Sequence, residues 1–244
     1  MNKIISAFLL LFSLSAHAVD VKTYIPTKAI PLLPIVRSEI EAMKPGFETA
    51  FMASAIEKES CLSLTHSRCW SPTARLLTYW DSGKNVRREH GQGLGQFTRT
   101  WHRDGSQRFD TLTELTTRYK TSLKGLNWTT IEDRPDLQIR AMVLLLTETW
   151  TILPPTMENK ERSAMTVSAY NAGKGRLNND RRTCKLKANC DPMKWFGHVE
   201  KIRAPGFSTR ILYGKRTAWD VNREHANEVM NIRMQKYVNW YKAN

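Results

Sequence analysis

The feature that most constrains the fold is a long apolar segment, Pro135 to Leu153, in the second half of the chain. Within it, residues 141–146 read Ala-Met-Val-Leu-Leu-Leu, so a helix here would be hydrophobic on every side. Such a helix belongs at the centre of a domain. Pro154-Pro155 ends it, because proline cannot continue a helix. We therefore expect the rest of the chain to be arranged around this buried helix.

Further helices are predicted on both sides of this segment. They share helix-forming residues uninterrupted by Gly or Pro, and lie at about 35–44, 51–59, 109–119, 161–172 and 221–241. Between Cys61 and His90 the pattern breaks into polar and turn residues, which predicts a long loop with a small hairpin at Ser82-Gly83. The fold class expected is mainly α, in one domain with a loop or β-hairpin insertion.

Residues 1–18 have the features of a secretory signal peptide. One basic residue, Lys3, precedes a mostly apolar run from Ile4 to Leu14, and Ala16-His17-Ala18 is a small-x-small cleavage pattern. The run is shorter than the ~20 apolar residues of a spanning helix, and an uncleaved anchor is the alternative. We expect cleavage before Val19, export to the periplasm or cell envelope, and no membrane span in the mature chain.

The chain is strongly basic. Removing residues 1–18 takes away one lysine and no acid, so the formal net charge moves from +14 to +13. This excess favours an anionic partner such as nucleic acid, a membrane surface or an acidic polymer. The basic residues are spread along the chain, and zinc-finger spacing, a P-loop and a glycine-rich dinucleotide turn are missing. Charge alone therefore leaves the class of partner open.

Four cysteines form two close pairs, Cys61/Cys69 and Cys184/Cys190. An even count in an exported chain predicts disulfides, although four cysteines allow three connectivities. Proximity favours pairing within each close pair. Metal binding is the competing interpretation, but neither pair has the C-x-x-C spacing of a zinc knuckle. We expect no metal and no cofactor.

A carboxylate stands at the end of an apolar helical stripe in residues 51–61. Met52, Ala55, Ile56 and Glu59 follow the i, i+3, i+4, i+7 spacing of an inward face. Poor solvation there would raise the pKa of Glu59, so that it could hold a proton near neutrality as a general acid. The alternative is a glutamate that merely ends a helix and turns to solvent. Glu57 points away from the stripe, and we expect its replacement to be nearly silent.

Two other segments carry candidate site residues. Residues 91–97 hold three glycines in five positions, which permit a tight turn or the close approach of a ligand. A phosphate-binding loop is the weaker alternative, because no strand is predicted before it and no Lys-Ser/Thr follows. In the helix at 161–172, Tyr170 and Asn171 lie near the end, where Gly173 is a suitable C-cap. A buried Tyr and Asn there could also simply satisfy one another.

These three segments, in this order and spacing, resemble the soluble lytic transglycosylase family, whose lysozyme-like catalytic domain is related to goose-type lysozymes. Glu59-Ser60 matches the family's Glu-Ser pair at a helix end. Residues 93–96 match its Gly-Leu-Met-Gln turn, with Gly95 in place of Met. Residues 169–173 match its Ala-Tyr-Asn-Ala-Gly helix end unchanged. The interval between Glu59 and Gln96 is longer than in many members.

The resemblance covers roughly Phe47 to Gly175 and implies a lysozyme-like fold. The expected organisation is a signal peptide at 1–18, a lead-in and short helix at 19–46, the catalytic domain at 47–194, and a helical extension at 195–244 packed on the same domain. The sequence leaves the oligomeric state open, with a monomer as the working expectation.

The resemblance also implies a reaction: cleavage of peptidoglycan between N-acetylmuramic acid and N-acetylglucosamine, leaving 1,6-anhydro ends. Glu59 would protonate the glycosidic oxygen, and the substrate's N-acetyl group would stabilise the positive centre. The muramic 6-hydroxyl would then close on C1 and give its proton to Glu59. Ser60, Gln96, Tyr170 and Asn171 would hold the sugar or orient Glu59. Peptidoglycan is then the expected partner, and nucleic acid is not.

Two alternatives stay open at this stage. A goose-type lysozyme or endolysin-like muramidase would need a second carboxylate to activate water, and Glu89, beside the glycine-rich turn, is the candidate. In the transglycosylase Glu89 would instead contact the substrate or steady its positive charge. Arg87 and Arg88 are its neighbours and should keep it ionised. The second alternative is a non-catalytic protein that binds cell wall or nucleic acid.

Overall fold

The computed structural model describes residues 19–81, 83–205, 209, 211–213 and 215–244. The expected signal peptide, residues 1–18, and Ser82 of the expected hairpin lie outside the described residues. The helices are α1 (Leu33–Met43), α2 (Thr49–Ser60), α3 (Thr111–Arg118), α4 (Pro135–Ile152), α5 (Asn159–Ala172), α6 (Lys174–Lys185), α7 (Ala218–Asn227), a π-helical segment η3 (Glu228–Arg233) and α8 (Met234–Ala243). Short 3₁₀ turns are η1 (Ile131–Asp133) and η2 (Val199–Lys201).

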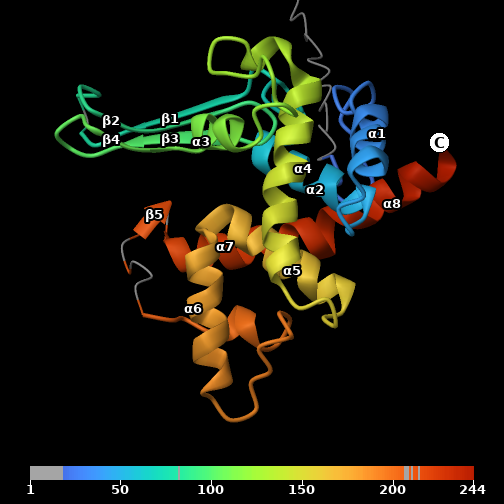
Figure 1. Cartoon of the computed structure of the whole chain (residues 1–244), viewed down its shortest axis with the longest axis vertical. Helices are drawn as coiled ribbons and strands as arrows, with labels where there is room; N and C mark the ends of the chain where they lie inside the picture. Colours follow the sequence, from blue (N-terminus) through green and yellow to red (C-terminus); the bar gives the residue numbers. More distant parts are fainter. Residues whose placement is uncertain (1–18, 82, 206–208, 210, 214) are drawn as a thin grey trace, which may run out of the picture.

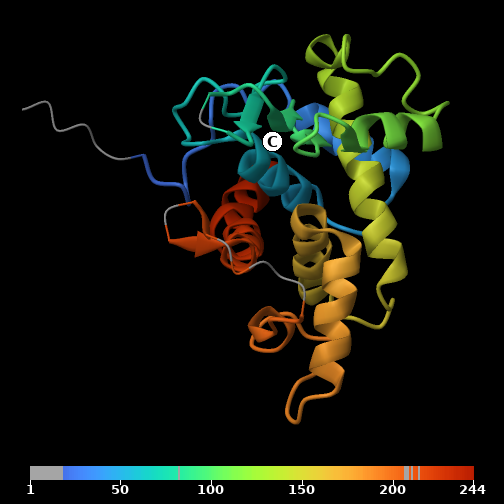
Figure 2. The same ribbon diagram turned by 90° about the vertical axis from the view of Figure 1, so that its left-hand side faces the viewer.

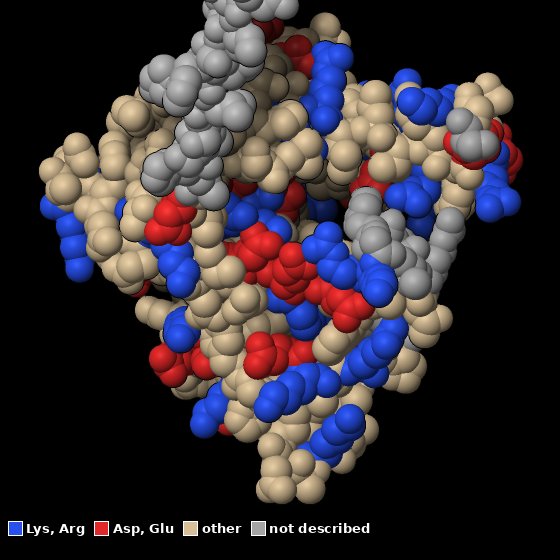
Figure 3. All heavy atoms as spheres, turned by 180° about the vertical axis from the view of Figure 1, so that it is seen from behind, with Lys and Arg blue, Asp and Glu red and all other residues tan. Residues whose placement is uncertain are grey.

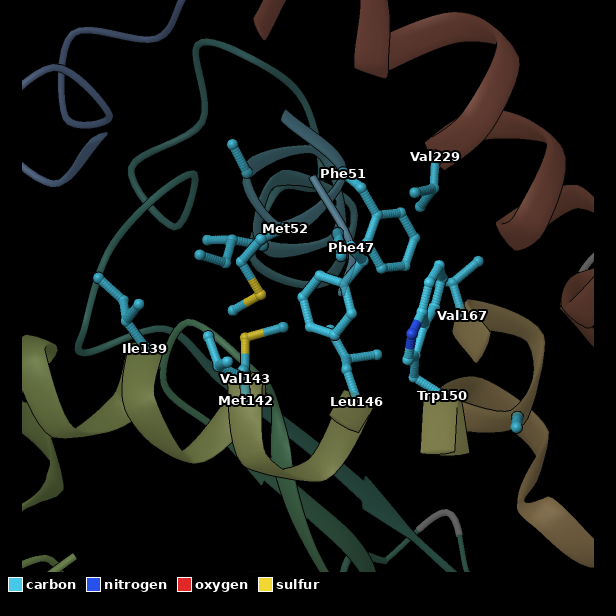
Figure 4. Close-up of a cluster of buried hydrophobic side chains, with 14 of the residues drawn as sticks. Phe47, Phe51, Met52, Ile139, Met142, Val143, Leu146, Trp150, Val167 and Val229 are labelled. Atoms are coloured by element: carbon cyan, nitrogen blue, oxygen red, sulfur yellow. The ribbon is translucent and has the colours of Figure 1, made fainter. Parts of the chain in front are cut away.

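Helix α4 runs through the middle of the molecule, as its apolar sequence predicts (Figure 1). It packs against α1 on one side and α5 on the other. Its buried side chains meet residues of α2 and the segment before it, and the ring centroids of Phe47 and Trp150 lie 5.6 Å apart (Figure 4). Leu144 and Leu145 are only partly buried, so one side of α4 is less covered than the sequence suggested.

A four-stranded antiparallel sheet extends from the helical body beside α4 (Figure 1). Its strands pair in chain order: β1 (Arg75–Tyr79), β2 (Arg87–Gln92), β3 (Phe97–Trp101) and β4 (Gln107–Asp110). The predicted hairpin corresponds to β1 and β2, while β3 and β4 were not expected. A strand therefore does precede the glycine-rich turn. Gly93 (φ 82°) and Gln96 (φ 47°) both adopt left-handed backbone in that turn, which joins β2 to β3.

The C-terminal part forms a helical unit against α5 and α2. Helix α7 begins at a capping box between Thr217 and Asp220, earlier than expected. It passes through η3 into α8, and α7 packs on α5 while α8 packs on α2. Figure 2 shows α6, which the sequence did not predict, projecting away from the body with the following loop. A short hairpin, β5 (Ile211–Tyr213) and β6 (Arg216–Thr217), precedes α7.

Both predicted disulfides, Cys61–Cys69 and Cys184–Cys190, are present. The first joins the end of α2 to the following loop, and the second closes the loop after α6. Among the described residues, no helix has the length and apolar character needed to cross a membrane.

Candidate active site

A cleft of about 380 Å³ opens where the C-terminal end of α2 meets the sheet and the end of α5. It gathers most of the candidate residues from the sequence, namely Glu59, Glu89, Gln96, Tyr170 and Asn171. A larger cavity of about 730 Å³ adjoins it, since both are lined by Cys61 and Leu62. Segments that lie far apart in the chain thus meet at this cleft.

Glu59 is the cleft's carboxylate at the end of α2. The stripe before it is buried as predicted, with Ile56 fully covered, and the Glu59 side chain itself is 15% exposed. Burial raises the pKa of Glu59 to about 7, although the charges of Lys58 and Arg68 partly oppose the rise. Within the described part of the chain, its ion-pair-type contact is with His225, whose Nε2 lies 3.4 Å from Oε1. Such a carboxyl group can hold a proton near neutral pH and release it.

Arg68 connects Glu59 to the glycine-rich turn. Its Nη2 donates to the Glu59 backbone carbonyl at 3.2 Å and to Oε1 of Gln96 at 2.5 Å. The Gln96 amide in turn donates to the carbonyl of Gly93 at 2.8 Å. Both ends of the Gln96 amide are therefore held in place, which fixes its position in the cleft.

Tyr170 and Asn171 close the cleft from the end of α5, and each is bonded elsewhere rather than to the other. The Tyr170 hydroxyl donates to the backbone carbonyl of Gly95 at 2.5 Å. The Asn171 Oδ1 accepts from Asn222 Nδ2 on α7 at 3.1 Å. Burial, and then the nearby Glu59 charge, hold the pKa of Tyr170 well above its usual value, so the phenol stays protonated.

The glycine at position 95 is required by its surroundings. A Cβ added there would lie 2.5 Å from Cγ of Met142 and 2.9 Å from the Tyr170 hydroxyl oxygen. The family motif has a methionine at position 95. Here Met142 of α4 places its side chain at this point of the turn instead. A larger residue at 95 would push Tyr170 out of its contact with the turn.

Ser60 lies outside the cleft, contrary to the expectation that it contacts substrate. It is fully buried, its Oγ donates to the Ile56 carbonyl at 2.8 Å, and the same oxygen accepts from the Trp70 backbone N–H at 3.0 Å. Both contacts are internal, so Ser60 joins the end of α2 to the loop that follows it.

The structure gives Glu57 buried contacts that the sequence did not predict. Its side chain does point away from the Glu59 stripe, but that side of α2 is covered by η3 and α8, and Glu57 is fully buried. Its carboxylate pairs with Arg233 at 2.7 Å and Lys236 at 2.8 Å, and accepts from the Tyr237 hydroxyl at 2.5 Å. A helical wheel cannot show a second buried face when the covering element lies 176 residues away.

Glu89 enters the cleft from the sheet. It lies on β2 two residues before Gly91, and because side chains alternate along a strand, both positions face the cleft. Its side chain is 35% exposed and lies 4.0 Å from the Arg88 guanidinium. Arg87 instead lies over the Trp101 ring, 5.3 Å from its centroid. Glu89 is therefore a solvated carboxylate at the rim.

The face in Figure 3 gathers acidic side chains in its middle, with Lys and Arg around them. Within the described residues, no group of three or more His, Cys, Asp or Glu is placed to hold a metal ion.

No protein-family model and no curated protein sequence matches the chain. Function must therefore be argued from the cleft itself.

Sequence reasoning missed Arg68 and His225, which both touch Glu59. The only signal for Arg68 was its place between the two cysteines of the first pair. His225 lies in the C-terminal extension, and nothing in the sequence around it indicated contact with Glu59. Both side chains reach Glu59 through the fold and not through local spacing.

Proposed function

We propose that this protein is a peptidoglycan lytic transglycosylase with Glu59 as its general acid. The observation that carries the proposal is the meeting of three separate segments in one cleft. The helix end with Glu59, the turn with Gln96, and the helix end with Tyr170 and Asn171 all line it. These are the segments whose sequences resemble the family, and their order and spacing gave no guarantee that they would meet.

The chemistry follows from the environment of Glu59. With its pKa raised to about 7, it carries a proton at near-neutral pH and can give it to the glycosidic oxygen. The substrate's N-acetyl group would stabilise the positive centre at C1, and the 6-hydroxyl of muramic acid would then attack. Glu59, now ionised, takes the hydroxyl proton and is restored. One protein carboxylate is sufficient for this route. The proposal also implies a lysozyme-like fold for the catalytic domain.

A long polymer fits the shape and charge of the protein. The cavity of about 730 Å³ shares Cys61 and Leu62 with the cleft, which offers further space next to it. Peptidoglycan is anionic, so a formal charge of +13 without residues 1–18 would retain the protein at its surface. The two disulfides are consistent with export to the periplasm or cell envelope.

A hydrolytic muramidase is the second candidate, and Glu89 is the observation that favours it. A solvated carboxylate across the cleft could activate water as a base. In the transglycosylase the same carboxylate would only steady the positive transition state. The two enzymes differ in product: 1,6-anhydro ends are lighter by one water than reducing ends.

The test is digestion of purified peptidoglycan followed by mass analysis of the muropeptides. We expect 1,6-anhydro products, and we expect Glu89→Gln to slow their formation without changing them. Reducing-end products that disappear in Glu89→Gln would make the protein a lysozyme. Wall binding without any soluble product, in the wild type and in Glu59→Gln alike, would make it a non-catalytic binder.

A further inference from the structure

His225 lies against the carboxyl group of Glu59 from the protein interior. It comes from α7, in the C-terminal unit, and is only 4% exposed. Its Nε2 lies 3.4 Å from Glu59 Oε1, and this shielded atom makes no hydrogen bond with any of the described residues. His225 does not line the cleft, whereas Glu59 does. A buried ring nitrogen without a partner requires an explanation.

We propose that His225 is a positioning residue that donates its Nε2–H to Glu59 Oε1. The proposal rests on the function proposed above, because it assigns His225 a part in presenting the acid. One oxygen of the carboxyl group is then held from behind. The other is free to carry the proton toward the cleft.

The assignment of the proton to Nε2 follows from what Glu59 must do. A protonated carboxyl group can donate to a bare Nε2 or accept from Nε2–H, so both tautomers fit that state. An ionised carboxylate can only accept, and only the Nε2–H tautomer keeps the contact after the proton has left. A hydrogen bond to a charged acceptor is also stronger than one to a neutral acceptor. The contact therefore strengthens as the acid releases its proton.

The ring stays neutral in these surroundings. Burial first, and then the charge of Lys58, lower the pKa of His225 to about 3, so it acts as a neutral donor and not as a cation. The charges of Lys58 and Arg68 lower the pKa of Glu59. Tyr170 lies near Glu59 on the side of the cleft. Glu228 and Arg233 of η3 form an ion pair beside His225.

The distance of 3.4 Å is longer than an ordinary N–H···O bond, so the two groups are adjacent without yet forming one. Contacts of this kind often tighten only when substrate is bound. The unliganded protein thus has the two groups in place, with the donor already desolvated.

The test measures the pKa of Glu59 directly, by ¹³C NMR of side-chain carboxyl carbons in labelled protein. The Glu59 signal is the one missing from Glu59→Gln. Loss of a donor to the charged form should raise the pKa of Glu59 from about 7 to about 8 in His225→Ala. His225→Gln, whose amide N–H can reach the same oxygen, should restore it. On peptidoglycan, His225→Ala should lower kcat about tenfold with KM nearly unchanged.

His90 provides the matched control. It is also a buried histidine whose Nε2 makes no hydrogen bond within the described part of the chain, but it lies beside Trp128, with the ring centroids 5.6 Å apart, and does not line the cleft. His90→Ala should cost comparable stability and leave the pKa of Glu59 unchanged.

An unchanged pKa in His225→Ala would overturn the proposal, as would an equal rise in His90→Ala. A fall would show that Nε2 accepts rather than donates, and would also overturn it. The NMR titration needs no activity. A wild type that does not cleave peptidoglycan would therefore refute the proposed function while the contact is judged separately.

Discussion

Glu57 and Glu59 lie on the same helix, two residues apart, and meet opposite environments. Glu57 is fully buried, but two cations and a phenol surround its carboxylate. Glu59 retains some exposure. Its carboxyl group contacts His225, which is neutral, and among the described residues no cation pairs with it. The more exposed of the two is the one whose environment suits proton transfer.

The comparison teaches that burial acts on a carboxyl group only together with its partners. A buried carboxylate with matched cations is part of the packing, and it holds the C-terminal unit to α2. A buried carboxyl group without them keeps its proton to higher pH. Helix α2 therefore has one face that attaches the C-terminal unit and another that ends in the cleft, and the two can be separated by mutation.

The largest expected effect is on activity in Glu59→Gln. An amide cannot donate the proton, so we expect turnover of purified peptidoglycan to fall by about 10²–10⁴-fold. The melting temperature and wall binding should be kept, because the amide has nearly the same shape. Residual turnover close to wild type would refute the role of Glu59.

Glu57→Gln should affect stability instead. Removing one member of a buried ion-pair cluster leaves Lys236 without the carboxylate of Glu57 and Arg233 with Glu228 alone, and breaking a buried pair typically costs about 3–5 kcal/mol of the free energy of unfolding. Urea denaturation would measure it, with Glu41→Gln on the exposed side of α1 as the control. Product chemistry should not change below the melting transition. A silent Glu57→Gln would mean that the ion pairs contribute nothing.

The pH dependence of stability should differ between wild type and Glu59→Gln. The folded-state pKa of about 7 exceeds the usual 4.5, so the folded state binds more protons between these values. The stabilising contribution is complete below about pH 4.5 and is lost as the pH rises to about 7. It corresponds to about 3 kcal/mol. Between pH 5 and 8, Glu59→Gln should therefore gain stability relative to wild type in urea titrations, and parallel curves would contradict the raised pKa.

Removal of a disulfide should have the smallest effect on stability, and the two disulfides lie at different distances from the cleft. Each closes a short loop, so replacing either pair with alanine should cost less than about 3 kcal/mol. Cys61–Cys69 brackets Arg68 beside Glu59, whereas Cys184–Cys190 lies at the far end of α6. Only loss of the first should lower activity when helicity is retained by circular dichroism. Equal losses of activity would mean that the cleft depends on the whole fold.

Local patterns predicted much of the helical framework. The ends of α4 and α5 follow from Pro154 and Gly173, and α3 lies within the helix predicted at 109–119, with Asp110 as its N-cap. Helix α6 was missed because it has almost no apolar stripe: Leu177 and Cys184 are its buried apolar residues. Strand β4, Gln107–Asp110, was missed because its mostly exposed residues show no alternation.

The cleft position of a side chain could be predicted where the residue itself belongs to a sequence motif, as for Glu59 and Gln96. It was not predictable where a side chain depends on a distant element. Glu57 and His225 belong to this second kind, since each acquires its role through contact between α2 and the C-terminal unit. Ser60 shows the converse, because a motif position turned out to serve packing.

The ion pairs of Glu57 also bear on the order in which the protein can mature. Synthesis runs in chain order, and Arg233, Lys236 and Tyr237 follow Glu57 by 176 or more residues. Until these residues have been made, the Glu57 carboxylate on α2 lacks its counter-charges. Helix α2 therefore completes its packing only after η3 and α8 have docked on it. Truncation before Arg233 should destabilise α2 and disorder the cleft at its end.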